Sequence, residues 1–426
     1  MNKTTIIFGS LLAMTLVGCG DEQQVSSSPA TTAQNVTHAE ILIPPTATDL
    51  TPQAVTEPSQ PGLNTRQEPV VFMQPLQGEF IATSPQWQQT SQSDEYWFRA
   101  TGRELNQGLP LAVSQPGSLI RLVPKTDLSS GFPVVPDAIA PDSISISKPG
   151  IKSASTLISS KADADALATA GLTDRSSALQ LSSTAPAGTY QLKVSQPLPA
   201  EASYLVNVKE KHSPYLLSLS APAAISNAEE TVAVQLNLTG RTVNLSPKAM
   251  LRLADGSEHK LDILPRDEGW QIRLPADIHR SGSNAGLNEL HLSIATEVDG
   301  VPVRRNIKSA YKAYVNSARF TDNANSHWQN HVPDGVSFTL DVASEGRYQL
   351  SAIVTGTDHR GKEHLLMRTE AATWLTPDSS VMTLPLDQQR IRASGLQAPF
   401  RVRALELKDQ GQMALLAYRE LALTLQ

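Results

Sequence analysis

The segment from Gly356 to Glu363 has the residue spacing of a phosphate-binding loop up to its last position. In that motif the backbone amides of a glycine-rich turn wrap the phosphates, a lysine reaches them, and a following Ser or Thr hydroxyl ligates magnesium. Here Lys362 is followed by Glu363, whose carboxylate would repel phosphate, and the bulky residues 358–360 crowd the turn. Strand-like segments lie on both sides. The sequence therefore predicts a hairpin turn and no nucleotide site.

Two histidines, His327 and His331, have the four-residue spacing that can ligate zinc on a helix. The glutamate that would activate a zinc-bound water is absent, and the neighbouring Asn, Ser, Pro and Gly residues are typical of a loop. The segment Asp-Asn-Ala-Asn at 322–325 has Ala324 where a calcium loop needs a ligand, and no glycine follows at its sixth position. We therefore expect no metal site and no cofactor.

Aromatic side chains are the remaining candidates for binding, because flat rings can stack on sugars. The candidates are Tyr96, Trp97, Phe98, Trp87, Trp270, Trp328 and Trp374. In a strand, Tyr96 and Phe98 would share one face and Trp97 would lie on the other, so at least one face belongs to a core. If Trp97, Trp328, His327 and His331 converged on one groove, they would indicate a glycan or metal site, whereas scattering or burial would favour a scaffold.

Catalytic signals are weak. The segment from Gly282 to Gly286 has its serine one place too early for a nucleophile elbow. A Ser/His/Asp triad needs only to meet in space, so one sequence does not decide it. No set of catalytic residue types converges in the sequence, and we expect a protein that is not an enzyme.

Cys19 is the only cysteine of the chain, which excludes a disulfide framework, an iron–sulfur cluster and a thiolate zinc site. It follows an apolar run over residues 6–17 that is too short to span a bilayer permanently. That run fits the hydrophobic region of a secretory signal. Residues 1–18 are therefore predicted to be a signal peptide.

Residues 16–19, Leu-Val-Gly-Cys, resemble the lipobox of bacterial lipoproteins. The resemblance implies that Cys19 becomes the first residue of the mature protein and carries a diacylglycerol and a further acyl chain. Two or more acyl chains hold a protein stably to a membrane. In Gram-negative lipoproteins an acidic residue directly after the cysteine retains the protein in the inner membrane. Gly20 at that position favours the outer membrane, with Asp21 one position late.

Length and composition predict several β-rich domains. The 426 residues correspond to two or three domains, and the 29 prolines and 24 glycines indicate many turns and a mainly β fold. The formal net charge is −6, so the chain lacks the excess of basic residues that is typical of a nucleic-acid-binding protein. Residues 19–69 are rich in Ser, Thr, Gln, Pro and Ala, and this composition predicts a disordered tether.

Three β-rich domains are predicted after the tether, at 70–211, 212–316 and 317–426. The first contains strand patterns at 95–99, 118–123, 189–194 and 203–208, with one helix over 161–170 that Ser160 would cap and Gly171 would end. The second has a period-two strand at 231–238 and hairpins at Asp255-Gly256 and Asp299-Gly300, as expected for an immunoglobulin-like sandwich. Continued alternation after residue 317 predicts another β-sandwich.

A glycine that precedes a strand with an early tyrosine recurs at 188–192 and 346–350, and a version without tyrosine occurs at 286–290. In immunoglobulin-like sandwiches the phenol at such a corner bonds back to the backbone. The spacing between these segments is not constant, which excludes an evenly repeating array.

The lipobox, the tether, the segment Tyr96–Gly102 and the two sandwich-like segments resemble an uncharacterised family of Gram-negative envelope lipoproteins with immunoglobulin-like domains. The resemblance implies no catalytic residues. We expect a protein anchored to the membrane through Cys19, with an envelope or extracellular protein as its partner and no nucleic acid. Its expected role is a non-catalytic interaction or scaffold module; the alternative is an accessory lipoprotein that binds a glycan or a divalent metal.

Overall fold

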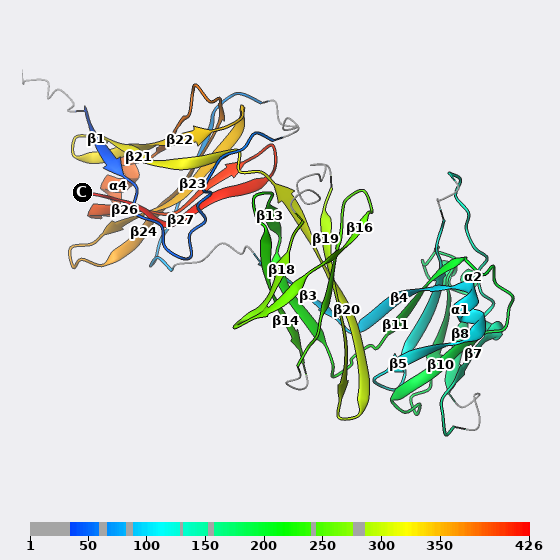
Figure 1. Cartoon of the computed structure of the whole chain (residues 1–426). Helices are drawn as coiled ribbons and strands as arrows, with labels where there is room; N and C mark the ends of the chain where they lie inside the picture. The colour runs from blue at the N-terminus through cyan, green and yellow to red at the C-terminus, as the bar shows by residue number, and fades with distance from the viewer. Residues whose placement is uncertain are drawn as a thin grey trace, which may run out of the picture.

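The protein folds into three β-sandwich units that follow one another in a row (Figure 1). The structure, a computed structural model, describes residues 35–58, 66–81, 88–127, 131–151, 157–239, 244–275 and 286–426. The predicted signal peptide, Cys19, Trp87 and the serine of the segment 282–286 lie outside these ranges. Within these ranges six sheets form the units, and all their strand pairs are antiparallel except that between Ala224–Ser226 and Lys312–Tyr314. This architecture confirms the predicted mainly β fold.

The first unit has a three-stranded and a five-stranded sheet around a core of buried Leu, Ile, Val and Tyr side chains. In sheet order the strands are β5 (Leu109–Val113), β10 (Gly188–Val194) and β7 (Ile144–Ser147), and then β4 (Glu95–Thr101), β11 (Ser203–Lys209), β6 (Leu119–Pro124), β9 (Ser177–Leu181) and β8 (Ile158–Ala162). Its helices are α1 (Gly102–Gln107), α2 (Ala164–Thr169) and a 3-10 turn over Pro141–Ser143.

The two α-helices of the first unit differ from the one that was predicted. Helix α2 begins after Asp163, whose carboxylate caps Ala166 N, because residues 158–162 are taken by β8. Gly171 has φ +90° just past the helix, as expected for a terminating glycine. Helix α1 was not predicted, although the reciprocal capping of Thr101 and Glu104 is a recognisable start signal.

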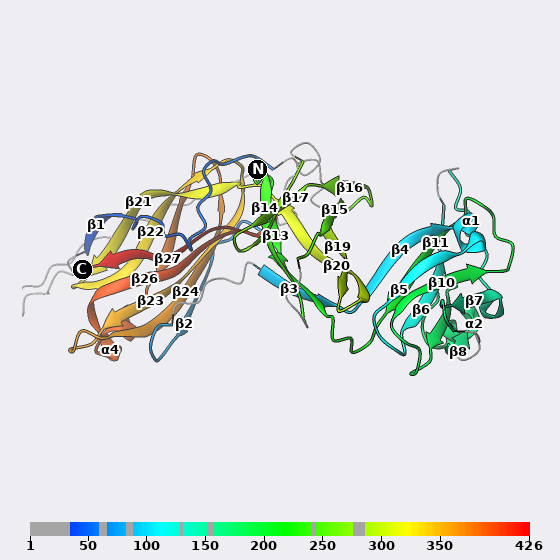
Figure 2. The same cartoon turned by 60° about the horizontal axis from the view of Figure 1, so that its bottom comes forward.

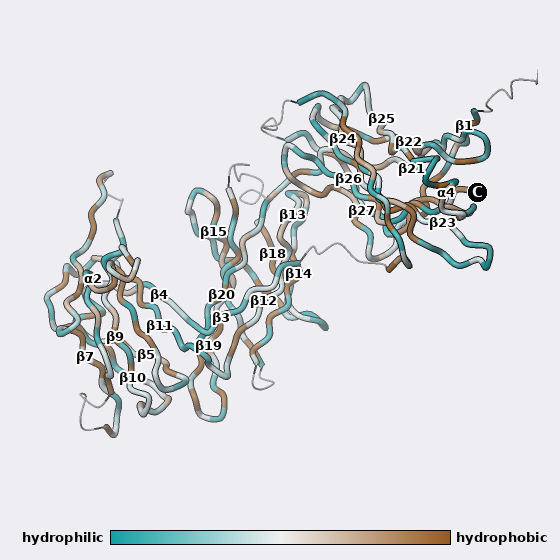
Figure 3. Tube along the Cα trace, turned by 180° about the vertical axis from the view of Figure 1, so that it is seen from behind, coloured by the Kyte–Doolittle hydropathy of each residue, from teal (hydrophilic) through white to brown (hydrophobic). Residues whose placement is uncertain are grey.

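The middle unit packs two five-stranded sheets against each other. The first contains β17 (Ile263–Arg266), β18 (Gly269–Arg273), β14 (Thr231–Leu238), β12 (Leu217–Pro222) and β3 (Gln88–Ser93); the second contains β13 (Ala224–Ser226), β20 (Val301–Tyr314), β19 (Asn288–Val298), β15 (Lys248–Arg252) and β16 (Glu258–Leu261). Both predicted hairpins form, with Gly256 at φ +88° and with Asp299 and Gly300 at φ +51° and +79°. Hydrophobic and hydrophilic residues alternate along these strands (Figure 3).

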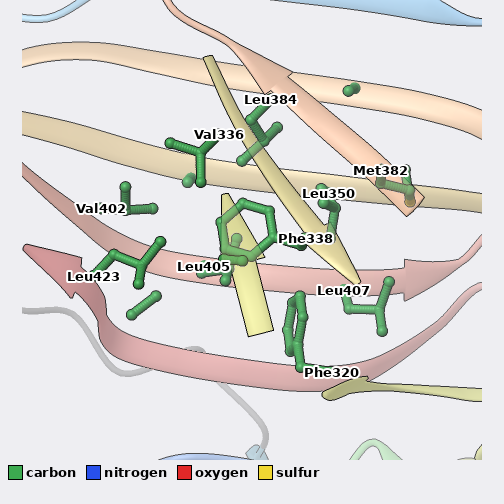
Figure 4. Packing of buried hydrophobic residues seen from close by; sticks show 14 of the residues in the cluster. Phe320, Val336, Phe338, Leu350, Met382, Leu384, Val402, Leu405, Leu407 and Leu423 are labelled. Carbon is green, nitrogen blue, oxygen red and sulfur yellow. The ribbon is translucent and has the colours of Figure 1, made fainter. Parts of the chain in front are cut away.

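The C-terminal unit has a four-stranded and a five-stranded sheet. The strands are β1 (Asn35–Ile41), β21 (Ala318–Gln329), β22 (Val332–Val342) and β25 (Val381–Pro385), and then β2 (Val70–Pro75), β24 (Glu363–Leu375), β23 (Gly346–Thr357), β26 (Gln397–Asp409) and β27 (Ala414–Leu425), with helix α4 (Gln388–Ser394) beside them. Side chains from both sheets meet in its core, where Phe338 and Leu384 face Leu405 and Leu407 (Figure 4).

The predicted disordered tether is wrong for residues 35–58 and 66–69. Strand β1 pairs with β21 over its whole length, Leu42 is buried in the C-terminal core, and Leu50 bridges to Tyr418. A low apolar content does not prevent order here, because an added edge strand gains its backbone hydrogen bonds from a sheet that already exists and needs few buried side chains of its own.

The predicted start of the first domain at residue 70 is also wrong. Strand β2 belongs to the C-terminal unit and β3 to the middle unit, so the first unit begins at β4 (Figure 2). Hydrophobic alternation identifies a strand but does not say which sheet it joins. The chain therefore runs along the C-terminal and middle units before it builds the first.

The two predicted tyrosine corners form. The Tyr190 hydroxyl donates to Pro186 O at 2.6 Å, and the Tyr348 hydroxyl donates to Ser344 O at 2.9 Å. In both cases the acceptor lies four residues upstream, as the corner geometry requires. At the third segment Asn288 instead accepts from Ala254 N at 3.1 Å.

Candidate functional site

The structure gives His327 and His331 different surroundings. His327 lies on β21, with Nδ1 3.2 Å from Thr37 Oγ1 and Nε2 2.7 Å from Ser337 Oγ. His331 has φ +60° in the turn between β21 and β22. The loop predicted around them is wrong up to Gln329, because this polar stretch is a strand paired on both sides. Within the described ranges, no group of three His, Cys, Asp or Glu side chains could hold a metal ion.

The aromatic candidates that the structure describes are scattered over the three units. Trp328 is 9% exposed in the C-terminal core and donates Nε1–H to Ser326 Oγ at 2.9 Å. Tyr96 and Phe98 stack on one face of β4, as predicted, and the Tyr96 hydroxyl donates to Ala112 O. Trp97 lies on the other face, edge to face with His291 of the middle unit. Trp270 packs against the middle core.

The phosphate-loop-like segment is the predicted hairpin, between β23 and β24. Asp358 accepts hydrogen bonds from the backbone N–H groups of Arg360 and Lys362, both at 2.8 Å, and Gly361 has φ +80°. The hydrogen bond from the Lys362 amide, followed by that from the His364 ring, lowers the pKa of Asp358 to about 2. The amides that would wrap a phosphate are thus occupied by an internal carboxylate.

A cleft of about 470 Å³ lies beside this hairpin in the C-terminal unit. It is lined by residues 76–78 that follow β2, by the start of β24 and by the end of helix α4. Arg390 is fixed in its wall by a hydrogen bond from Nε to Leu366 O at 3.0 Å, and His364 Nε2 lies 3.0 Å from Asp358 Oδ2. Leucine side chains, the Arg390 guanidinium and the Asp358 carboxylate therefore border the same space, which could hold a small molecule with an apolar part and a charged group.

The junction between the first and middle units contains a buried ion pair that the sequence analysis missed. Arg305 of β20 and Glu210, directly after β11, lie 2.7 Å apart and are both 0% exposed. Ser114 N donates to Glu210 at 2.6 Å, while Arg305 donates to Ser213 Oγ and Tyr215 O, both at 2.8 Å. The connecting residues 210–215 therefore wrap around the guanidinium and hold the two units together.

A signal for this ion pair was present in the sequence. Within the strand after Val301, position 305 has the same parity as Val303, Ile307 and Tyr311, which are all buried. An arginine on the core face of a period-two strand needs a buried partner of opposite charge. The sequence does not show that the partner comes from another unit.

The junction between the middle and C-terminal units is held by hydrogen bonds to Gln412. Its side chain accepts from Val315 N at 2.9 Å and donates to Val315 O at 3.1 Å and to Asp409 Oδ2 at 2.7 Å. Ser317 Oγ also donates to Asp409 Oδ2, at 2.6 Å. Thr56 of the N-terminal segment donates its N–H to Asn316 O at 2.8 Å, so three separate parts of the chain meet here.

In the described part of the chain, no helix combines the length and apolar character that crossing a bilayer requires.

Comparisons with known proteins give a family and a fold. Residues 62–210 match the N-terminal domain, and residues 317–426 the C-terminal domain, of a family described as a domain of unknown function, DUF4785. A crystal structure of a DUF4785 family protein from Legionella pneumophila subsp. pneumophila is similar to this chain, with a TM-score of 0.61 and 16% identity. The similarity covers 87% of this chain and 98% of that chain, and it shows the fold. None of the curated proteins matches.

Proposed function

The chain belongs to the DUF4785 family, and from that premise we propose that it is a lipid-anchored protein of the bacterial cell envelope with a non-catalytic interaction or scaffold role. The observation that carries this proposal is the position of the candidate ligand-binding side chains. Trp97 lies at a junction between units, Trp328 is buried in a different unit, and His327 is held by two hydroxyl groups. Rows of β-sandwiches offer loops and strand edges to partners.

Membrane attachment through Cys19 would order the units by distance from the membrane in the reverse of their order in the chain. Asn35, the first residue of β1, is sixteen residues after Cys19. Sixteen residues reach at most about 55 Å. Since β1 belongs to the C-terminal unit, that unit would lie nearest to the membrane and the first unit farthest from it. Gly20 after the cysteine favours the outer membrane.

Labelled-lipid incorporation tests the anchor. We expect label in the wild-type chain and none in Cys19→Ala, because only the thiol can accept the diacylglycerol. Equal labelling of both chains would contradict the proposal. The interaction role is tested separately by crosslinked pull-down from intact envelopes. A reproducible envelope protein partner would support that role.

An accessory ligand-binding role is the second candidate, and the cleft beside Arg390 favours it. The test is metal analysis and a glycan array on the wild-type chain, followed by a screen of small carboxylates. Saturable binding that is lost in Arg390→Ala would establish the cleft as a ligand site. The matched control is Arg392→Ala, because Arg392 lies on the same helix but outside the cleft. Stoichiometric metal or saturable glycan binding would overturn the interaction role.

A further inference from the structure

Strand β2 leaves an apolar edge uncovered. It is the last strand of its sheet, and among the described residues no strand pairs with its outer side (Figure 2). Val70, Val71, Phe72 and Met73 are 55%, 51%, 57% and 40% exposed, so apolar side chains are exposed on both faces of the strand. Exposed edges of this kind are usually shielded by charges, and an unshielded one pairs readily with another strand.

The edge carries no charge of its own. From Pro69 to Gly78 the chain has no acidic or basic residue. By contrast, the edge strand β1 carries His38 and Glu40, and β16 carries Glu258 and Lys260. A strand that pairs with β2 would therefore have no charge to desolvate and none to repel it.

The hydrogen bonds to the sheet show which backbone groups of this segment face outward. Arg66 O and Glu68 O accept from Arg347, Leu76 N donates to Leu366 O, and Gly78 O accepts from Leu365 N. All four residues have even numbers. Because the direction of the backbone groups alternates along a strand, the N–H and C=O groups of the odd-numbered residues face outward. Those residues are Pro69, Val71, Met73 and Pro75.

The outward edge is self-complementary about Phe72. Reading outward from it in either direction gives an apolar residue at the first position and proline at the third. We propose that β2 pairs antiparallel with β2 of a second copy of this chain, about a twofold axis through Phe72. Val71 and Met73 of one chain then exchange backbone hydrogen bonds with Met73 and Val71 of the other. The two chains form four such bonds.

The prolines are compatible with this register and mark its two ends. Pro69 lies opposite Pro75 of the second chain, so the positions without an N–H face each other. In this register the outward N–H groups of Val71 and Met73, which lie between the prolines, all have acceptors. Glu68 lies opposite Leu76, so no like charges meet. The inference names a partner for the interaction role proposed above, and it does not depend on the lipid anchor.

Cysteine crosslinking of the full chain tests the register. Two Phe72 positions on the axis form a pair without hydrogen bonds, with Cα atoms about 4.5 Å apart, and this distance suits a disulfide. Val70→Cys is the matched control, because it is equally exposed but lies about 13 Å from its own copy, four residues away along the strand. The parent chain, with Cys19 alone, gives the background.

We expect a disulfide-linked dimer of Phe72→Cys after mild oxidation and only background for Val70→Cys. Equal crosslinking of the two variants, or none above the parent chain for either, would overturn the proposal.

Sedimentation in detergent gives a second measurement. The wild-type chain should have twice the monomer mass, and Phe72→Lys should be monomeric because two ammonium groups would face each other on the axis. The control Ile81→Lys should remain a dimer, since exposed Ile81 lies outside the strand. A monomeric wild-type chain would overturn the proposal.

Dimer formation and lipid labelling have separate readouts. If neither the wild-type chain nor Cys19→Ala incorporates the label, the lipid anchor is refuted and the dimer proposal is unaffected. If the wild-type chain is monomeric but still incorporates lipid, the dimer proposal is refuted and the lipid anchor is supported.

Discussion

Arg305 occupies a position on β20 where alternation calls for an apolar side chain, and Glu210 neutralises it. A buried ion pair contributes little net stability compared with an apolar pair, but loss of one partner leaves a charge buried without compensation. The pair therefore serves to fix the first unit against the middle unit in one orientation.

We expect Arg305→Ala to lower the free energy of unfolding by about 3–5 kcal/mol, because it leaves the Glu210 carboxylate buried without its partner. Urea denaturation gives the measurement. Arg103→Ala is the control, since Arg103 pairs with Glu201 at the surface, where such pairs contribute at most about 1 kcal/mol. Equal effects of the two substitutions would show that the junction does not depend on the buried pair.

Asp358 makes the turn between β23 and β24 sensitive to acid. Its pKa is lowered to about 2 by the amide of Lys362 and by His364, whereas an unfolded Asp has a pKa of about 3.9. The folded turn therefore favours the carboxylate. Its stabilising effect is complete above the unfolded pKa and is lost as pH falls towards 2. A carboxyl NMR titration should show its midpoint near 2, and a midpoint near the unfolded value would refute the hydrogen-bonded turn.

At the level of elements, alternation and turn residues predicted most strands of the middle and C-terminal units. The predicted hairpins at 255–256, 299–300 and 356–363 form because Asp-Gly pairs and a positive-φ glycine fix turns locally. Strands β1 and β21 were missed because their Asn, Ser, Thr and His residues hide the period of two. Their stability comes from neighbouring strands far away in sequence, which local patterns do not contain.

The order of the N-terminal segment can be tested at two adjacent residues. Leu42 is 4% exposed in the C-terminal core, whereas Ile41 is 76% exposed. We expect Leu42→Ala to destabilise the C-terminal unit by about 2–5 kcal/mol because it opens a cavity, and Ile41→Ala to change its stability by less than about 0.5 kcal/mol. Thermal unfolding monitored in that unit is the measurement. A segment that does not pack would give no difference between the two variants.

Over the whole molecule, the sequence predicted three β-rich parts but not the path that links them. Composition distinguishes polar from apolar segments, yet it does not show that strands β1, β2 and β3 lie on units completed much later in the chain. The candidate site residues were subject to the same limit. The spacing of His327 and His331 in the sequence suggested a shared site. The residues that do form a close pair, Glu210 and Arg305, are 95 positions apart.

The proposed anchor at Cys19, together with the place of β1 in the C-terminal unit, predicts the distances of the units from a membrane. Dyes can be attached to two variants, Val381→Cys in the C-terminal unit and Phe132→Cys in the first unit, because both positions are exposed. With acceptor-labelled lipids in vesicles, energy transfer should be stronger from position 381 because β1 holds that unit close to Cys19. Equal or stronger transfer from position 132 would contradict the arrangement.

The pairing of β1 with β21 also determines when the protein can fold. His38 and Ser326 are partners across that ladder, so nearly three hundred residues separate the two strands in the chain. Long-range contacts of this kind slow folding because loop closure has to precede the contacts. The described strands of the first unit all come from residues 95–209, so it needs no strand from the other units to fold. The C-terminal unit can be completed only when β27 is available, so we expect β1 and β2, which precede the first unit in the chain, to become ordered after it.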